Sequence, residues 1–238
     1  MTPTTPPLPC QAVLFDLDGT LVETAVDLAG AMNHVLAKRG YPTLPLAQVR
    51  NMVGHGARVL LARGFWGFGA QPPDGDPDFE AAVRDFLDYY GDHLVDGSRP
   101  FPGVEDTLDQ LLDQGYKLAV VTNKPEHLTL KMLKLLDLDR RFQAVVGGDT
   151  LSRRKPDPHP LWHALDALGV PAAAAVMVGD SETDVASGRA AGCAVVAVTY
   201  GYNRDQPVRE LNPDRITDHF AELPTLLVHP AGANRNSP

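Results

Sequence analysis

Short apolar runs alternate along this chain with longer stretches in which apolar residues recur at helical spacing. Five runs lack polar alternation and predict buried strands, at 12–15, 117–122, 143–146, 174–179 and 194–198. Amphipathic patterns between the later runs predict helices at 104–114, 125–137, 158–168 and 182–191. This order predicts an α/β fold with a doubly wound, Rossmann-like parallel sheet.

The segment from about 24 to 94 has a different pattern. It carries helical patterns and no convincing strand, and it directly follows the first predicted strand; the helices are predicted at 26–39, 46–52, 57–62 and 79–94. We therefore predict an all-helical cap domain inserted into the core. The predicted division places the catalytic core at 10–20 and 97–229, the cap at 21–96, and flexible tails at 1–9 and 230–238.

Composition narrows the possible partners. The chain of 238 residues has a formal net charge of −9 and no long basic cluster, which argues against a nucleic-acid partner. Its two cysteines, Cys10 and Cys193, form neither a disulfide framework nor a metal-ligand spacing. We see no secretory signal and no apolar run near ~18 residues, so we expect a cytoplasmic protein without a membrane partner. The sequence leaves the oligomeric state open.

Asp16 and Asp18 follow the first predicted strand within the segment DLDGT. Residues two apart in an extended chain face the same side, so both carboxylates are expected to project from the strand's carboxyl end, with Leu17 in the core. Open α/β sheets bind ligands at that edge. A polar strand exit leading into a turn at Gly19 is the simpler alternative for this motif taken alone.

A second acidic pair, Asp180 and Asp184, follows the fourth predicted strand. Asp184 alone would be an ordinary capping acid near a helix N-terminus. If the first and fourth strands are neighbours, however, the acids converge, and two like charges ~4 Å apart repel by about 4 kcal/mol at an effective dielectric near 20. A cation offsets this repulsion, and hard oxygen ligands favour Mg²⁺.

Two further elements are expected at the same edge. Thr122 and Asn123 end the second predicted strand, and Lys155 precedes a predicted helix. Lys155 can offset the acidic charge and bind phosphate oxygens. Taken singly, Thr122 is better explained as a strand-end residue and Lys155 as a surface lysine, but their joint placement with the acids favours one common site.

These elements resemble the four signature motifs of the haloacid dehalogenase superfamily: D16-L-D18-G-T, T122-N, K155-P and G-D180-S-E-T-D184. The resemblance spans roughly residues 12 to 199 and places a cap where this chain has its helical insert. It implies that Asp16 is a nucleophile on phosphorus and that Asp18 acts as acid and then as base. A simple dehalogenase lacks the second aspartate of the first motif, so Asp18 argues against dehalogenation.

The resemblance also implies ligand roles. Mg²⁺ would be held by the Asp16 carboxylate, the Asp18 backbone carbonyl and Asp180, while Asp184 would hold waters bound to the metal. Thr122 and Lys155 would clamp the phosphoryl oxygens of a small phosphate ester, and Asn123 is predicted to bind the substrate beside them.

The cap and neighbouring segments narrow the resemblance to phosphoglycolate phosphatases. The segments concerned are LVET at 21–24, VGHGAR at 53–58, TNK at 122–124 and YGYN at 200–203. Arg58, with His55 as the next candidate, would read the substrate's carboxylate; the simpler alternatives are an exposed helix charge and a turn residue. Other readings stay open: a phosphosugar phosphatase (including one for N-acetylmuramic acid 6-phosphate), a β-phosphoglucomutase-like phosphotransferase, or a binding module without catalysis.

Overall fold

A parallel β-sheet forms the centre of the core. The computed structural model describes residues 6–202 and 208–230. The sheet has six strands in the order β6-β5-β2-β7-β8-β9. They are β2 (Ala12–Phe15), β5 (Lys117–Val121), β6 (Ala144–Val146), β7 (Ala175–Gly179), β8 (Ala194–Val198) and β9 (Arg215–Thr217). Since β2 pairs in parallel with both β5 and β7, the first and fourth apolar runs are neighbours, which is the condition under which the acidic residues converge.

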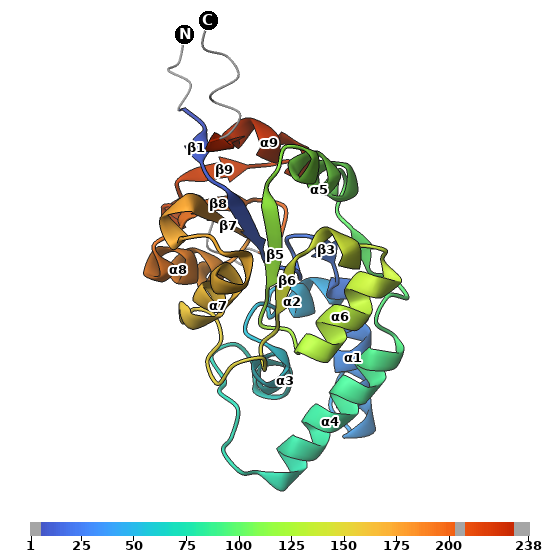
Figure 1. The fold of residues 1–238 in the computed structure, drawn as a ribbon. Helices are drawn as coiled ribbons and strands as arrows, with labels where there is room; N and C mark the ends of the chain where they lie inside the picture. Colours follow the sequence, from blue (N-terminus) through green and yellow to red (C-terminus); the bar gives the residue numbers. More distant parts are fainter. Residues whose placement is uncertain (1–5, 203–207, 231–238) are drawn as a thin grey trace, which may run out of the picture.

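Helices cover both faces of this sheet (Figure 1). They are α5 (Val104–Asp113), α6 (Glu126–Leu135), α7 (His159–Leu168) and α8 (Glu182–Ala191). Alternate residues of β2 enter different cores: Val13 and Phe15 pack with α5 and α6, whereas Ala12 and Leu14 pack with α7. This burial on both faces explains why the strands read as continuous apolar runs, and it confirms the doubly wound α/β fold.

Four helices fill the insert between β2 and α5, and we keep the name cap for residues 21–96. They are α1 (Ala25–Lys38), α2 (Leu46–Arg50), α3 (Ala57–Trp66) and α4 (Pro77–Asp92). Asp76 caps α4 by accepting hydrogen bonds from the N–H groups of Asp78 and Phe79, and Pro77 occupies the first turn. The apolar sides of α1 and α4 pack together, so the cap has its own buried contacts within the larger core cluster.

The chain enters and leaves the cap through adjacent segments. Strand β3 (Val22–Glu23) pairs antiparallel with β4 (Arg99–Pro100). Just beyond this pair, the Asp27 carboxylate accepts hydrogen bonds from the backbone N–H groups of Gly97 and Ser98 and from the Ser98 hydroxyl. The two connections to the cap are therefore tied to each other beside the core.

Several short elements were not expected from the sequence. Strand β1 (Leu8–Pro9) pairs with β10 (Leu227–Val228), so the predicted tail at 1–9 is wrong at residues 8 and 9. Residues 1–5 and 231–238 of the predicted tails lie outside the described residues. The remaining short helices are η1 (Asp139–Arg141), η2 (Ala172–Ala174), η3 (Val208–Leu211), η4 (Phe220–Glu222) and α9 (Leu223–Leu226).

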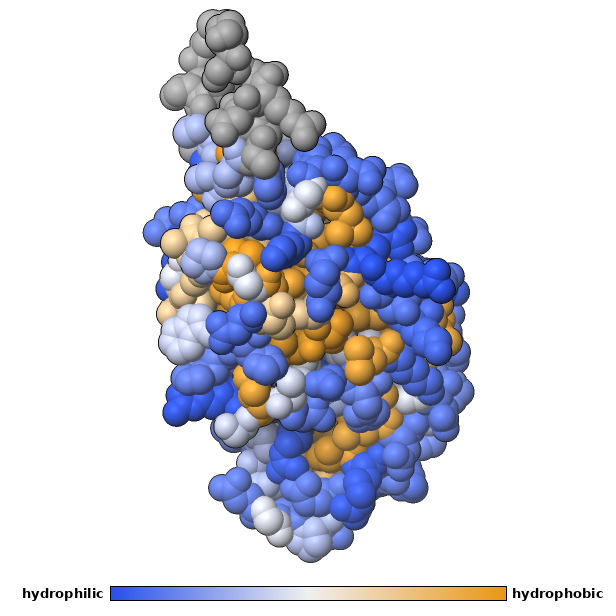
Figure 2. Space-filling view, in the orientation of Figure 1, coloured by the Kyte–Doolittle hydropathy of each residue, from blue (hydrophilic) through white to orange (hydrophobic). Residues whose placement is uncertain are grey.

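The surface is largely hydrophilic on the face shown in Figure 2, with apolar residues grouped in its centre and lower part. No helix in the described part of the chain combines the length and apolar character needed to cross a bilayer.

Candidate active site

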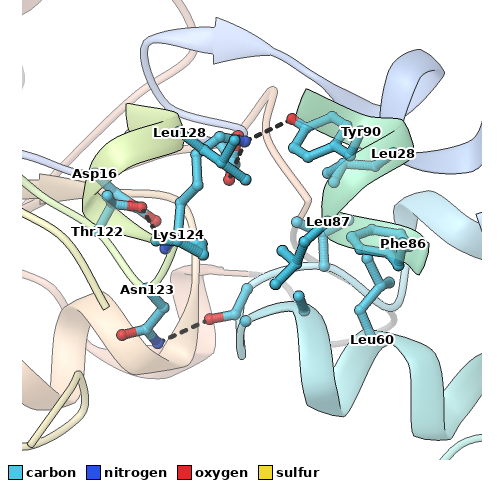
Figure 3. A pocket seen from close by; sticks show the side chains of 16 residues that line it. Asp16, Leu28, Leu60, Phe86, Leu87, Tyr90, Thr122, Asn123, Lys124 and Leu128 are labelled. Carbon is cyan, nitrogen blue, oxygen red and sulfur yellow. Dashed lines mark hydrogen bonds and ion pairs between the residues drawn. The ribbon is translucent and has the colours of Figure 1, made fainter. Parts of the chain in front are cut away.

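A small cavity lies between the carboxyl edge of the sheet and the cap (Figure 3). Its volume is about 40 Å³. The core side is polar and the cap side is mainly apolar. The core contributes Asp16, Asp18, Thr122, Asn123, Lys124, Pro125 and Leu128, and the cap contributes Leu28, Val53, Gly54, Gly56, Ala57, Leu60, Phe86, Leu87 and Tyr90. The predicted catalytic edge is thus enclosed by the cap.

Asp16 directly follows β2, and only 5% of it is exposed. Its Oδ1 accepts a hydrogen bond from the Leu17 N–H at 2.7 Å and lies 3.0 Å from Lys155 Nζ. Its Oδ2 has no hydrogen-bond partner among the described residues. Leu17 is fully buried, as predicted. One carboxylate oxygen is therefore fixed in place while the other has no such contact.

Asp16, Asp180 and Asp184 form a buried acidic cluster in which carboxylate oxygens lie within 4.8 Å of one another. Burial is the main cause that raises the pKa of Asp16 to about 7, and repulsion from Asp184 and Asp18 adds to it. Burial likewise raises the pKa of Asp180 well above its ordinary value, with Asp184 and Asp16 contributing. The cluster therefore disfavours its own full ionisation in the absence of a cation.

Lys155 is the cation within this cluster. Its Nζ lies 3.0 Å from Asp16 Oδ1 and 2.7 Å from Asp184 Oδ1, and the residue is 2% exposed. Burial acts to lower the pKa of Lys155, but attraction to Asp16 and Asp184 outweighs it and the net shift is upward. Three carboxylates and one ammonium leave two negative charges, which is the charge that one divalent cation would balance.

The donor set fits such a cation. Every candidate ligand atom in the cluster is a carboxylate oxygen, a hard ligand of the kind that Mg²⁺ prefers, and no soft thiolate or imidazole belongs to this cluster. Burial is the main cause of the raised pKa values of Asp16 and Asp180, and repulsion among the carboxylates adds to it, so a bound divalent cation would favour their ionised forms.

Asp180, which directly follows β7, is held by residues from the segments that follow β2 and β8. Its Oδ1 accepts a hydrogen bond from the Thr20 hydroxyl at 2.8 Å, and its Oδ2 accepts one from the Tyr202 N–H at 2.6 Å. Gly19 has a φ of +89°, and a Cβ there would lie 2.5 Å from Asp180 Oδ2. Only glycine fits this close approach.

Asp184 has two structural roles. It occupies the first turn of α8, where its Oδ2 accepts hydrogen bonds from the N–H and the hydroxyl of Ser181. Its Oδ1 faces Lys155. The capping contacts and the contact with Lys155 are made by different oxygens of the same carboxylate, and the role of Asp184 beside a metal stays a prediction.

Thr122 and Asn123 follow β5 directly. Thr122 lines the cavity, and its hydroxyl accepts a hydrogen bond from the Lys124 N–H at 3.3 Å. The Asn123 side-chain amide donates to the backbone carbonyls of Gly54 in the cap, at 3.1 Å, and of Lys155, at 3.0 Å. Asn123 therefore links the cap to two parts of the catalytic edge.

Lys124 was not identified as a site residue from the sequence. It lines the cavity and is 5% exposed. Its Nζ lies 3.1 Å from Asp18 Oδ1 and 2.5 Å from the Tyr90 hydroxyl (Figure 3). Burial lowers the pKa of Lys124, and the Asp18 carboxylate opposes that shift. The sequence feature that could have identified Lys124 is its position directly after the Thr122-Asn123 motif.

The structure places Arg58 and His55, the two cap residues predicted to bind substrate, outside the lining of the cavity. Arg58 lies on α3, 2.6 Å from Glu80 of α4, with its guanidinium 5.4 Å from the centre of the Phe79 ring. Neither Arg58 nor His55 is among the described residues that line the cavity, although Gly54, Gly56 and Ala57 beside them are. The structure therefore gives Arg58 an acidic partner within the cap.

The Tyr200-Gly201-Tyr202-Asn203 segment also reaches the site, except for Asn203, which lies outside the described residues. The Tyr202 hydroxyl accepts hydrogen bonds from the N–H groups of Thr24 and Ala25 at the start of α1 and donates one to Glu23. Tyr202 thus connects Asp180 to the base of the cap.

Residues 13–198 match the family of haloacid dehalogenase-like hydrolases. The chain therefore belongs to this family and is a hydrolase. It is similar to the phosphoglycolate phosphatase of Thiobacillus denitrificans, with 42% identity over 93% of this chain and 97% of that protein. The phosphoglycolate phosphatase of Rhodospirillum rubrum is 44% identical over 92% of each chain. A crystal structure of a predicted phosphoglycolate phosphatase from Haemophilus somnus superposes with a TM-score of 0.84 and 37% identity, covering 91% of this chain and 97% of that one.

Proposed function

We propose that this hydrolase is a magnesium-dependent phosphatase that converts 2-phosphoglycolate to glycolate and phosphate through an aspartyl-phosphate on Asp16. The proposal rests on the different surroundings of the two carboxylate oxygens of Asp16. One oxygen is fixed by Leu17 and Lys155, and the other has no hydrogen-bond partner among the described residues at the edge of the cavity. Such a carboxylate is oriented for attack on phosphorus.

The first step forms a bond between Asp16 Oδ2 and phosphorus while the bond to the ester oxygen breaks. Asp18 lines the same cavity and gives a proton to the departing alkoxide. In the second step, Asp18 takes a proton from a water that attacks phosphorus, which releases phosphate and restores Asp16. One carboxyl group therefore serves as acid and then as base.

Charge on the transferring group is offset by Lys155 and by the Thr122 hydroxyl, which bind phosphoryl oxygens in this proposal. The Asp16 and Asp180 carboxylates and the Asp18 backbone carbonyl would hold Mg²⁺, with Asp184 orienting its waters. Bound there, the ion would supply positive charge to the phosphoryl oxygens and neutralise the acidic cluster.

The choice of substrate rests on the cavity wall and on similarity. The cap side of the cavity is mainly apolar and offers few partners for the hydroxyl groups of a sugar, which favours a short ester. The two relatives from Thiobacillus denitrificans and Rhodospirillum rubrum, each similar over more than nine-tenths of the chain, are phosphoglycolate phosphatases.

A panel of esters tests the proposal. Phosphate release with Mg²⁺ is measured for 2-phosphoglycolate, ethyl phosphate, glucose 6-phosphate, N-acetylmuramic acid 6-phosphate and glucose 1-phosphate. We expect kcat/KM to be at least about 100-fold higher for 2-phosphoglycolate, the size of preference that a matched polar contact provides. A higher value for a sugar phosphate would reassign the substrate, and isomerised sugar phosphate would indicate a phosphotransferase.

A further inference from the structure

Lys124 is a buried cation outside the residues to which the four motifs assign a role. Among the described residues that line the cavity it is the only cationic side chain, since Lys155 lies between Asp16 and Asp184. A buried ammonium in a substrate cavity requires an anionic partner. In this structure that partner is Asp18, at 3.1 Å and 3.4 Å from its two carboxylate oxygens.

We propose that Lys124 and Tyr90 together bind the carboxylate of the substrate, which takes the place that the Asp18 carboxylate occupies beside Lys124. This inference rests on the proposed function, because it needs a substrate that carries both a phosphate and a carboxylate. It assigns recognition of the carboxylate to a core lysine and a cap tyrosine, and not to Arg58.

The donor inventory of the pair supports this assignment. Lys124 donates to the Tyr90 hydroxyl oxygen at 2.5 Å, so the hydroxyl hydrogen remains available, and no described residue accepts it. An ammonium has three donors, of which Asp18 and Tyr90 use two. The pair therefore offers an N–H and an O–H side by side, an arrangement that matches the two oxygens of a carboxylate.

The surroundings strengthen such an interaction. Tyr90 is 1% exposed, and Lys124 Nζ lies 4.3 Å from the centre of its ring, so the ammonium is held against the aromatic face. The cavity wall around the pair is apolar, formed by Leu28, Phe86 and Leu128. A charged contact in such a setting is less screened than at the surface. The same wall offers no partner for the hydroxyl groups of a sugar.

The geometry also couples recognition to the cap. Tyr90 belongs to α4 of the cap, whereas Lys124 follows β5 of the core. The two donors come together only when the cap lies over the core, as it does here (Figure 3). A carboxylate bound between them would bridge the two parts, and its arrival would release the Asp18 side chain from Lys124, so that Asp18 in its protonated form can face the ester oxygen.

Two substrates and three variants test the inference. 2-Phosphoglycolate and ethyl phosphate differ by the carboxylate, so the ratio of their kcat/KM values isolates its recognition. Lys124→Met removes the charge and keeps the length of the side chain. Because Lys124 also contacts Asp18, both activities change, and the ratio is the readout: we expect kcat/KM for 2-phosphoglycolate relative to that for ethyl phosphate to fall by about 100-fold or more, the loss typical for a buried charged contact.

Tyr90→Phe removes only the hydroxyl group, and we expect a selective loss of about 10-fold for 2-phosphoglycolate. It keeps the test informative if Lys124→Met fails to fold. Lys134→Met, at an exposed lysine on α6, is the matched control and should leave kcat/KM unchanged for both substrates.

Equal losses on both substrates in Lys124→Met and Tyr90→Phe would overturn the inference, since the pair would then act on catalysis alone. A wild-type protein that turns over ethyl phosphate as well as 2-phosphoglycolate would instead overturn the proposed substrate. The two failures are therefore distinguishable.

Discussion

The side-chain amide of Asn123, at the end of core strand β5, donates to the backbone carbonyl of Gly54 in the cap at 3.1 Å. The same amide donates to the Lys155 carbonyl at 3.0 Å. A single side chain thus holds the cap loop and the segment that carries the cluster's lysine.

Removing this amide should loosen the cap over the catalytic edge. In Asn123→Ala we expect kcat/KM to fall by about 10-fold, because an unpaired buried carbonyl costs about 1–3 kcal/mol. Hydrogen exchange of the amides around Gly54 should become faster. Unchanged exchange together with unchanged turnover would show that the cap is held by its other contacts.

Asp16→Asn should abolish turnover and leave the fold intact. The amide is nearly isosteric, and the raised pKa of Asp16 shows that its surroundings disfavour the negative charge that the substitution removes. We expect kcat to fall to the background rate while the melting temperature without metal is unchanged or higher. Substantial remaining turnover would exclude Asp16 as the nucleophile.

Metal binding should depend on pH. The pKa of Asp16 is raised to about 7 from an ordinary value of 3.8, so the folded state retains a proton that the unfolded chain loses in between. Stability of the metal-free protein should therefore fall as pH rises from about 4 to 7 and then level off. Mg²⁺ competes with that proton, so its stabilisation should be larger at pH 8 than at pH 6.

Thermal melting with and without Mg²⁺ at those two pH values measures this effect. Asp16→Asn provides the control, because without the titrating carboxylate the difference between the two pH values should shrink. A metal-induced shift of equal size at both values in the wild type would contradict the prediction.

Gly19→Ala should damage the site and the fold together. The residue has a φ of +89°, and a Cβ would meet Asp180 Oδ2 at 2.5 Å. Gly192 is a matched control, since its φ is +84° and nothing lies within 4 Å of a Cβ there. We expect Gly192→Ala to lower the free energy of unfolding by about 1–2 kcal/mol and to keep kcat. Gly19→Ala should lose more stability and most of its turnover; equal behaviour would show that the close approach is unimportant.

The variant Arg58→Ala distinguishes the substrate-binding role predicted from the sequence from the ion pair with Glu80 that the structure shows. If Arg58 reads the carboxylate, Arg58→Ala should raise KM for 2-phosphoglycolate far more than for p-nitrophenyl phosphate. Because Arg58 pairs with Glu80 and does not line the cavity, we expect small and equal changes for both. Exposed pairs of this kind contribute about 0–1 kcal/mol to stability. A selective rise in KM would return Arg58 to substrate recognition.

The local sequence pattern was sufficient to predict the longer helices and the apolar strands. Strand β2 and helix α8 have the predicted bounds, and Asp16, Thr122 and Asp180 directly follow strands of one sheet. Strand β9 was missed because its three residues, Arg215–Thr217, include a charge and form no apolar run. The β1–β10 pair was missed because it joins segments more than two hundred residues apart.

Site residues defined by distant partners were harder to predict. Lys124 is separated by 34 residues from Tyr90 and by 106 residues from Asp18, so no local pattern indicates that the three meet. Arg58 looked available for substrate because its partner Glu80 lies on another helix. In both cases the tertiary fold decides which charge faces the cavity.

The pairing of Leu8–Pro9 with Leu227–Val228 has a practical consequence for handling the enzyme. The two ends of the described chain lie side by side, at the end of the molecule opposite the helical cap (Figure 1). An affinity tag, a fusion partner or a solid support joined beyond either of these segments would therefore be attached on the side of the core away from the cap. Tethered enzyme should turn over substrate at the same rate as enzyme free in solution.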